Sequence, residues 1–129
     1  MPHIEMVYSA NLDGPVDLSA LCEALRREAV TIDAFPLAGV RVRAIRADHF
    51  AIADGNPQHG FIDLSIRLRE GRSEEVKKDA IQRIFDAARA YLTPYMSEHP
   101  LALSAEIRDI NAALSPKCGT IRDHLKAPS

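Results

Sequence analysis

The sequence contains no tryptophan and few other aromatic residues, which argues against a protein that binds nucleic acid by stacking side chains on bases. Its formal net charge of −2 provides no general attraction to nucleic acid or to an anionic membrane. No apolar segment approaches the length of a membrane span, and the N-terminus lacks the basic region and apolar run of a signal peptide. We therefore expect a cytoplasmic protein with no nucleic-acid or membrane partner.

Patterns that hold metals or cofactors are also missing. Cys22 and Cys118 have neither metal-ligand spacing nor the arrangement of a disulfide framework, so we expect two free thiols. None of the five histidines is spaced from another histidine or a cysteine as metal ligands are, so we expect no metal site. His3 alternates away from Pro2 along a predicted strand, and we expect it to pack in the core or at an interface. No Ser-His-Asp order, Walker loop or dinucleotide fingerprint is present.

The chain does contain one pattern, strand–helix–strand, twice: in residues 2–56 and again in residues 60–110. Asp17 and Ser73 are suited to cap the two helices. Pro94 either kinks the end of the second helix or terminates it. The polar residues 111–129 have the character of an arm. The predicted elements are, in order, strand 2–8, helix 17–31, strand 40–46, strand 61–68, a helix from Ser73 to about residue 92, and strand 101–107.

A helix between two strands implies a crossover connection, and such connections join parallel strands. We therefore predict a single α+β domain over residues 1–129, with a four-stranded mixed sheet and two helices on one of its faces. The apolar strand residues do not all lie on one side of their strands; they include Ile4, Met6, Val40, Val42, Phe61, Leu64, Ile66 and Leu68. This distribution predicts that the uncovered sheet faces are buried between subunits.

Arginine carries the clearest chemical signal. Arg41 and Arg43 point to the same face of the second strand, so together they can grip a carboxylate, although each is also plausible as a solvated charge. Arg72 stands in a Gly-Arg-Ser loop before a helix, where a guanidinium and free backbone N–H groups favour anion binding. Arg46 also lies on the second strand, and Arg67 and Arg69 lie at the end of the third strand.

Pro2, directly after the initiator methionine, has two interpretations. Proline is tolerated at the first position of a strand, because no ladder hydrogen bond is lost there. If Met1 is removed, however, Pro2 becomes a free secondary amine, and α-amines titrate near neutral pH, at about 7.7–8.0. Such an amine, fixed on a strand, is suited to carry protons. A nearby arginine would favour its neutral form and lower its pKa.

These residues resemble the 5-carboxymethyl-2-hydroxymuconate isomerase family of the tautomerase superfamily. Each matching segment is weak alone, but together they come in the order and spacing of that family from residue 2 to about residue 110. The segments are Pro2, Phe35-Pro36-Leu37-Ala38-Gly39-Val40-Arg41, Ala53-Asp54-Gly55, Gly71-Arg72-Ser73 and Leu101-Ala102-Leu103-Ser104-Ala105-Glu106-Ile107.

The resemblance implies a tautomerase-like fold and a homotrimer that needs no cofactor. It implies that Pro2 is the general base and that Arg41 and Arg72 are catalytic and bind a dicarboxylate or tricarboxylate enol. From its position on the same strand face as Arg41, and not from the resemblance, Arg43 is also expected to bind this substrate. The implied reaction is the shift of a proton and conjugated double bonds in 5-carboxymethyl-2-hydroxymuconate, in homoprotocatechuate (4-hydroxyphenylacetate) catabolism. Two alternatives stay open: a tautomerase for another 2-hydroxy or 2-keto acid, and a trimeric binding module without catalysis.

Overall fold

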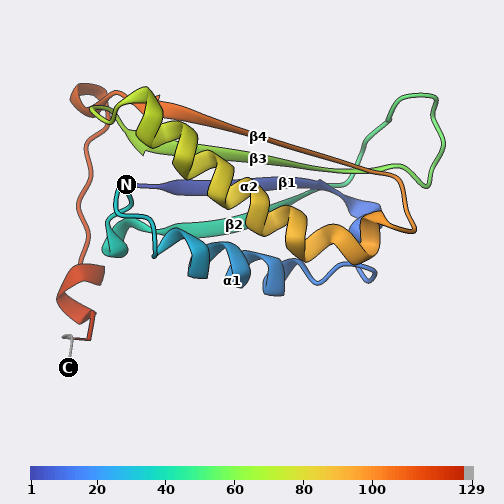
Figure 1. Ribbon diagram of the computed structural model, residues 1–129, viewed down its shortest axis with the longest axis horizontal. Helices are drawn as coiled ribbons and strands as arrows, with labels where there is room; N and C mark the ends of the chain where they lie inside the picture. Colours follow the sequence, from blue (N-terminus) through green and yellow to red (C-terminus); the bar gives the residue numbers. More distant parts are fainter. Residues whose placement is uncertain (127–129) are drawn as a thin grey trace.

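Two β-α-β units form the chain, as shown by a computed structural model that describes residues 1–126 (Figure 1). Residues 127–129 of the predicted arm lie outside the described residues. The strands and helices are β1 (His3–Ser9), α1 (Leu18–Ala29), β2 (Arg41–Ala47), β3 (Gly60–Arg69), α2 (Glu74–Met96) and β4 (Leu101–Ile110). The predicted elements are therefore all present, with ends that shift by up to four residues.

Both helices begin where the sequence predicts a cap. The Asp17 side chain accepts a hydrogen bond of 3.0 Å from the backbone N–H of Ala20, and Ser73 accepts one of 3.2 Å from Val76. Each bond satisfies an N–H group that has no partner within the helix. Pro94 does not terminate α2, which continues to Met96 with the proline in its last turns.

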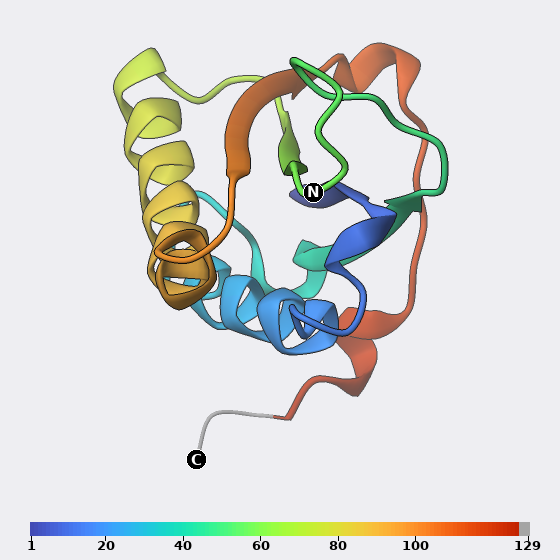
Figure 2. The same cartoon turned by 90° about the vertical axis from the view of Figure 1, so that its right-hand side faces the viewer.

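The strand order in the sheet is β2-β1-β3-β4. β1 pairs parallel with β2, and β3 pairs parallel with β4, as expected for two crossover units. β1 and β3 pair antiparallel and join the two halves. Figure 2 shows both helices on one side of this sheet. The predicted mixed sheet with helices on one face is confirmed.

The core lies between the helices and the sheet. Ile4, Met6, Leu64 and Ile66 occupy the helix-facing side of β1 and β3 and are fully buried. Full burial of one such side chain stabilises the fold by about 1.5–3 kcal/mol. The helices contribute the other half of this cluster, including Leu21, Leu25, Ile84 and Leu92.

The second face of the sheet is more polar than the sequence suggested. On β1 it presents His3, Glu5 and Val7, whose side chains alternate with the core residues and are partly exposed. Of the apolar strand residues named above, only Phe61 lies on this face, where its ring meets that of Phe50 edge-on at 6.5 Å. The idea that several strands are apolar on both faces is therefore corrected, because the alternation is nearly regular.

After β4 the chain forms an arm that runs back past the N-terminus (Figure 1). It contains two short 3-10 turns, Ala112–Leu114 and Ile121–His124, and its side chains are mostly exposed. No helix among residues 1–126 is long and apolar enough to cross a membrane.

Candidate active site

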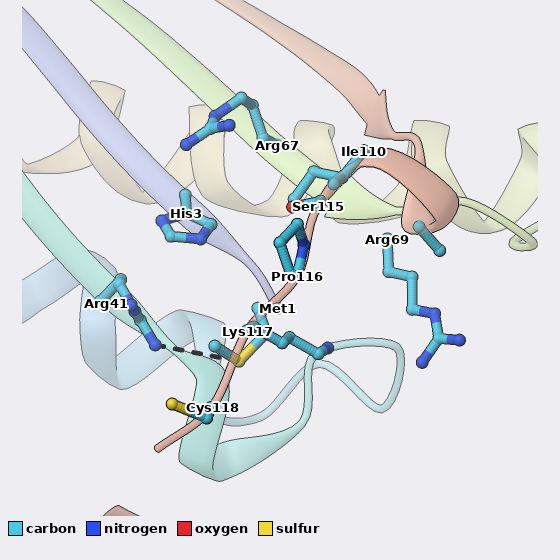
Figure 3. A pocket seen from close by; sticks show the side chains of 11 residues that line it. Met1, His3, Arg41, Arg67, Arg69, Ile110, Ser115, Pro116, Lys117 and Cys118 are labelled. Atoms are coloured by element: carbon cyan, nitrogen blue, oxygen red, sulfur yellow. Dashed lines mark hydrogen bonds between the residues drawn. The ribbon is translucent and has the colours of Figure 1, made fainter.

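A pocket of about 410 Å³ lies at the edge of the sheet where the chain begins (Figure 3). The sheet pairing creates this position: β1 and β2 start here in parallel, while β3 and β4 end here. The arm provides the remaining wall. The pocket is lined by Met1, His3, Arg41, Arg67, Arg69, Ile110, Ala112, Ser115, Pro116, Lys117 and Cys118.

The charged lining of the pocket is entirely basic. Arg41 comes from β2, Arg67 and Arg69 from β3, and Lys117 from the arm, while no Asp or Glu is among the described residues that line the cavity. Within residues 1–126, none of these four side chains forms a salt bridge. Four cations without counter-ions make this pocket a site for a ligand with several negative charges.

The amino terminus lies in the middle of these cations. Pro2 is fully buried, and Met1 reaches into the pocket, where its Sδ accepts a hydrogen bond of 3.8 Å from Arg41 Nη2. Burial, followed by the positive charges of Lys117 and Arg72, lowers the pKa of the Met1 amine from its ordinary value. An amine at this end of β1 is therefore biased toward its neutral form.

His3 lines the pocket and is not part of the core, contrary to one of the two roles expected for it. It is the register partner of both Arg41 on β2 and Arg67 on β3, so the three side chains share one row of the sheet. Burial and the charges of Arg41 and Arg67 lower the pKa of its imidazole. Its Nδ1 is buried and has no hydrogen-bond partner among the described residues. His3 thus forms a wall of the pocket and is biased toward its neutral form.

The three arginines predicted for the site lie in different environments. Arg41 lines the pocket. Arg72 does not: its guanidinium donates to the backbone oxygens of Arg69 at 3.1 Å and Ala34 at 3.0 Å. It is nevertheless close enough to the Met1 amine to affect that pKa. Arg72 therefore contacts the backbone of the pocket residue Arg69 without lining the pocket itself.

Arg43 has a partner already. Its Nη2 lies 2.8 Å from Oε2 of Glu5 on the neighbouring strand, and it does not line the pocket. The prediction that Arg41 and Arg43 grip one carboxylate together is not met in this arrangement, although the two side chains do share a strand face. Arg67 and Arg69 take the place next to Arg41 that was expected for Arg43.

Among residues 1–126 there is no group of three or more His, Cys, Asp or Glu side chains that could hold a metal ion. Cys118 is at the edge of the pocket, and Cys22 is partly buried on α1. Burial raises the pKa of the Cys22 thiol. The groups available for chemistry in the pocket are therefore the terminal amine, the imidazole, the basic side chains, the Ser115 hydroxyl and the Cys118 thiol.

Comparison with known proteins identifies the family. The model of the 5-carboxymethyl-2-hydroxymuconate isomerase family matches residues 2–125. The chain belongs to this family. The 5-carboxymethyl-2-hydroxymuconate Delta-isomerase of Escherichia coli is 29% identical over 117 residues, which cover 91% of this chain and 93% of that protein.

Solved structures of this isomerase family and of 4-OT proteins share the fold of the chain. A crystal structure of a 5-carboxymethyl-2-hydroxymuconate delta-isomerase is 33% identical, with a TM-score of 0.89, and covers 100% of this chain and 95% of that one. A fused 4-OT, described as a wild-type symmetric trimer, shares the fold at 24% identity and a TM-score of 0.60, over 84% of this chain and 85% of that one. The fold of the chain is thus tautomerase-like, as its β-α-β pattern and the resemblance predicted.

Proposed function

We propose that this protein isomerises 5-carboxymethyl-2-hydroxymuconate in the cytoplasm, within homoprotocatechuate catabolism, with Pro2 as the general base. The observation that carries the proposal is that Met1, whose removal would make the buried Pro2 the terminal residue, lines a pocket whose charged side chains are all basic. The family name and the E. coli relative supply the substrate. That substrate carries three carboxylates, since muconate is a dicarboxylate and the carboxymethyl group adds one more.

The base requires removal of Met1. While Met1 is attached, the ring nitrogen of Pro2 belongs to a tertiary amide and has no lone pair available for a proton. After removal it is a secondary amine at the same end of β1, facing the cations that lower the pKa of the Met1 amine. A neutral amine at working pH is what a general base needs.

The proposed reaction moves one proton out and one proton in. The amine takes the proton of the 2-hydroxyl group, and the oxygen forms a carbonyl with C2. The electron pairs of the C2–C3 and C4–C5 double bonds shift, a double bond forms between C3 and C4, and C5 takes a proton from the ammonium group. The amine is thereby restored, and no group outside the protein and its substrate is consumed.

The basic side chains stabilise the charge that this shift creates. Arg41 lies beside the amino terminus and is placed to bind the C1 carboxylate and the developing carbonyl oxygen, where preorganised donors lower the barrier most. Arg72 supports the site from behind, through its bonds to Ala34 and Arg69 and through its positive charge. Arg43 is paired with Glu5, so we propose that Arg67 and Arg69, which line the pocket, bind the substrate in its place.

We further propose that the protein is a homotrimer. The fused 4-OT of the same fold is described as a trimer. The sheet face that the helices leave uncovered also retains apolar residues, among them Ile45, whose side chain is 46% exposed. Contact between subunits through this face would remove those side chains from water.

An ultraviolet assay of ketonisation tests the function. Protein shown by mass spectrometry to begin at Pro2 is mixed with 5-carboxymethyl-2-hydroxymuconate, and loss of the conjugated dienol is followed at a catalytic enzyme concentration. In D₂O the product should carry deuterium at C5. Absence of turnover with this acid, together with turnover of another 2-hydroxy or 2-keto acid, would assign the protein to a different tautomerase activity. Absence of both would indicate a binding module.

A further inference from the structure

We propose that Lys117, which the arm carries into the pocket, binds the third carboxylate of the substrate and makes the site selective for a tricarboxylate over a dicarboxylate. The inference rests on the proposed function and deepens it. Lys117 is not among the site residues expected from the sequence, and the structure brings it to the pocket.

The position of the arm is the first argument. Lys117 is more than a hundred residues from Met1 in sequence, yet both line the same pocket. Figure 3 shows the side chain of Lys117 extending across Met1, with Arg41 on one side and Arg69 on the other. Among the charges that lower the pKa of the Met1 amine, Lys117 is the largest contributor. The ammonium group thus lies close to where the reacting amine is proposed to be.

The second argument is the number of charges. Arg41, Arg67 and Arg69 come from the sheet, and they suffice for the two carboxylates of a 2-hydroxymuconate chain. A third carboxylate on a side branch needs a further cation, placed off the line of the main chain. Of the four basic residues that line the pocket, Lys117 is the one that comes from the arm and not from the sheet. It is therefore the cation placed to meet a carboxylate on a side branch of the substrate.

The third argument is the lack of a competing partner. Within the described residues, no carboxylate lies within the 4.0 Å salt-bridge distance of Lys117 Nζ. Asp123 lines a neighbouring hollow together with Lys117, but the two do not form an ion pair. Lys77 shows the contrast, because its ammonium binds Asp109 at 3.2 Å. Lys117 is therefore available to a ligand.

The test compares two substrates in full-length protein that begins at Pro2. The ratio of kcat/KM for 5-carboxymethyl-2-hydroxymuconate to kcat/KM for 2-hydroxymuconate is measured in wild type, Lys117→Gln, Lys117→Arg and Lys126→Gln. Lys126 is the matched control, since it is an exposed lysine of the same arm that lines neither hollow. We expect the ratio to fall about tenfold in Lys117→Gln, as loss of one charge-assisted contact at a partly exposed site implies, and to be largely restored in Lys117→Arg. The control should keep the wild-type ratio.

An unchanged ratio in Lys117→Gln, or equal losses for both acids, would overturn the proposal, because Lys117 would then be absent from recognition or would only hold the arm in place. Calorimetry separates this outcome from failure of the proposed function. The probes are pentane-1,2,5-tricarboxylate and adipate, saturated acids with the same placement of carboxylates. If the wild type turned over neither substrate, the proposed function would be wrong. The binding affinities of the two probes would still test the role of Lys117: the wild type should bind the tricarboxylate more tightly than adipate, and Lys117→Gln should lose this preference.

Discussion

Gly39 and Pro2 approach each other so closely that a side chain at residue 39 has no room. A Cβ built on Gly39 would lie 3.1 Å from Cδ of Pro2 and 3.2 Å from Cα of Met1. Gly39 stands at the end of the Phe-Pro-Leu-Ala-Gly segment that leads into Arg41. The loop before β2 therefore fixes the position of the terminal ring as well as that of the arginine beside it.

Gly39→Ala should consequently impair catalysis more than folding. The added methyl group pushes the Pro2 ring by a few tenths of an ångström, and misplacement of a reacting group by about 1 Å can cost on the order of 100-fold in rate. We expect kcat/KM to fall about tenfold or more, with a melting temperature lowered by only about 2–4 °C. Gly119→Ala is the control, since a Cβ there meets nothing within 4 Å. Equal effects of the two substitutions on kcat/KM would contradict the contact.

Retention of Met1 should abolish turnover while the fold remains. The amide nitrogen of Pro2 cannot carry a proton, whereas the sheet and core are complete with Met1 in place. Removal of Met1 should restore activity and change the melting temperature by no more than about 4 °C, since no fully buried side chain is lost. Pro2→Ala after processing should retain partial activity through its primary amine. Full activity in protein that mass spectrometry shows to be uniformly Met1-bearing would falsify the proline-base mechanism.

The arginines should differ in importance according to their positions. Arg41→Ala should lower kcat/KM by ~30- to 1,000-fold, the loss expected for one charge-assisted contact made in the transition state. Arg72→Ala should have a smaller but clear effect, because Arg72 holds the wall of the pocket. Arg46→Ala should have almost none, since Arg46 binds Asp13 and Asp48 at the far end of β2. Steady-state kinetics of the three variants checks this order, and a loss in Arg46→Ala equal to that in Arg72→Ala would refute it.

The pH profile should show a base whose pKa is below the ordinary range of an α-amine. Activity requires the neutral amine, so kcat/KM rises as pH rises through its pKa. Burial of the terminus and the cations around it favour loss of the proton and move this rise to lower pH. Removal of one positive charge in Lys117→Gln should raise the pKa and shift the rise to higher pH, whereas Lys126→Gln should leave it in place. A shift in the opposite direction would show that Lys117 does not act on the amine.

Light scattering at micromolar concentration should give a mass of about three times the 14.2 kDa of the chain. A charge placed in the apolar part of the open sheet face, as in Ile45→Glu, should shift the population toward the monomer. The matched substitution Leu114→Glu places the same charge on an exposed arm residue and should leave the mass unchanged. A clean monomer in the wild type would rule out the trimer.

The fold could be predicted because its signals are local. The alternation of β1 and the caps Asp17 and Ser73 involve residues no more than a few positions apart. Pro2 and Arg41 could be predicted for the same reason, since each stands in a short recognisable segment. The face on which Phe61 lies could be predicted in the same way, because Ile62 and Leu64, which have the opposite parity in the same strand, are buried.

The rest of the pocket depends on contacts between distant segments. His3 has the same parity as Glu5 and the opposite parity to the core residue Ile4, so strand alternation alone distinguishes its face from the core face. Arg43 shares a face with Arg41, but its pairing with Glu5 is a property of two neighbouring strands. No local pattern could reveal Lys117, because the arm has no periodicity and its path is set by what it contacts.

The pocket brings Met1 together with residues 115–118 of the arm, and this gives the order of synthesis a role in maturation. Met1 is synthesised more than a hundred residues before the arm residues Ser115 to Cys118. On the proposed mechanism Met1 must be cleaved, and it is most accessible to an aminopeptidase before the arm covers it. Cleavage of Met1 would thus precede completion of the pocket by the arm. A chain that stops before residue 115 would have the sheet and a trimmed terminus but would lack one wall of the pocket.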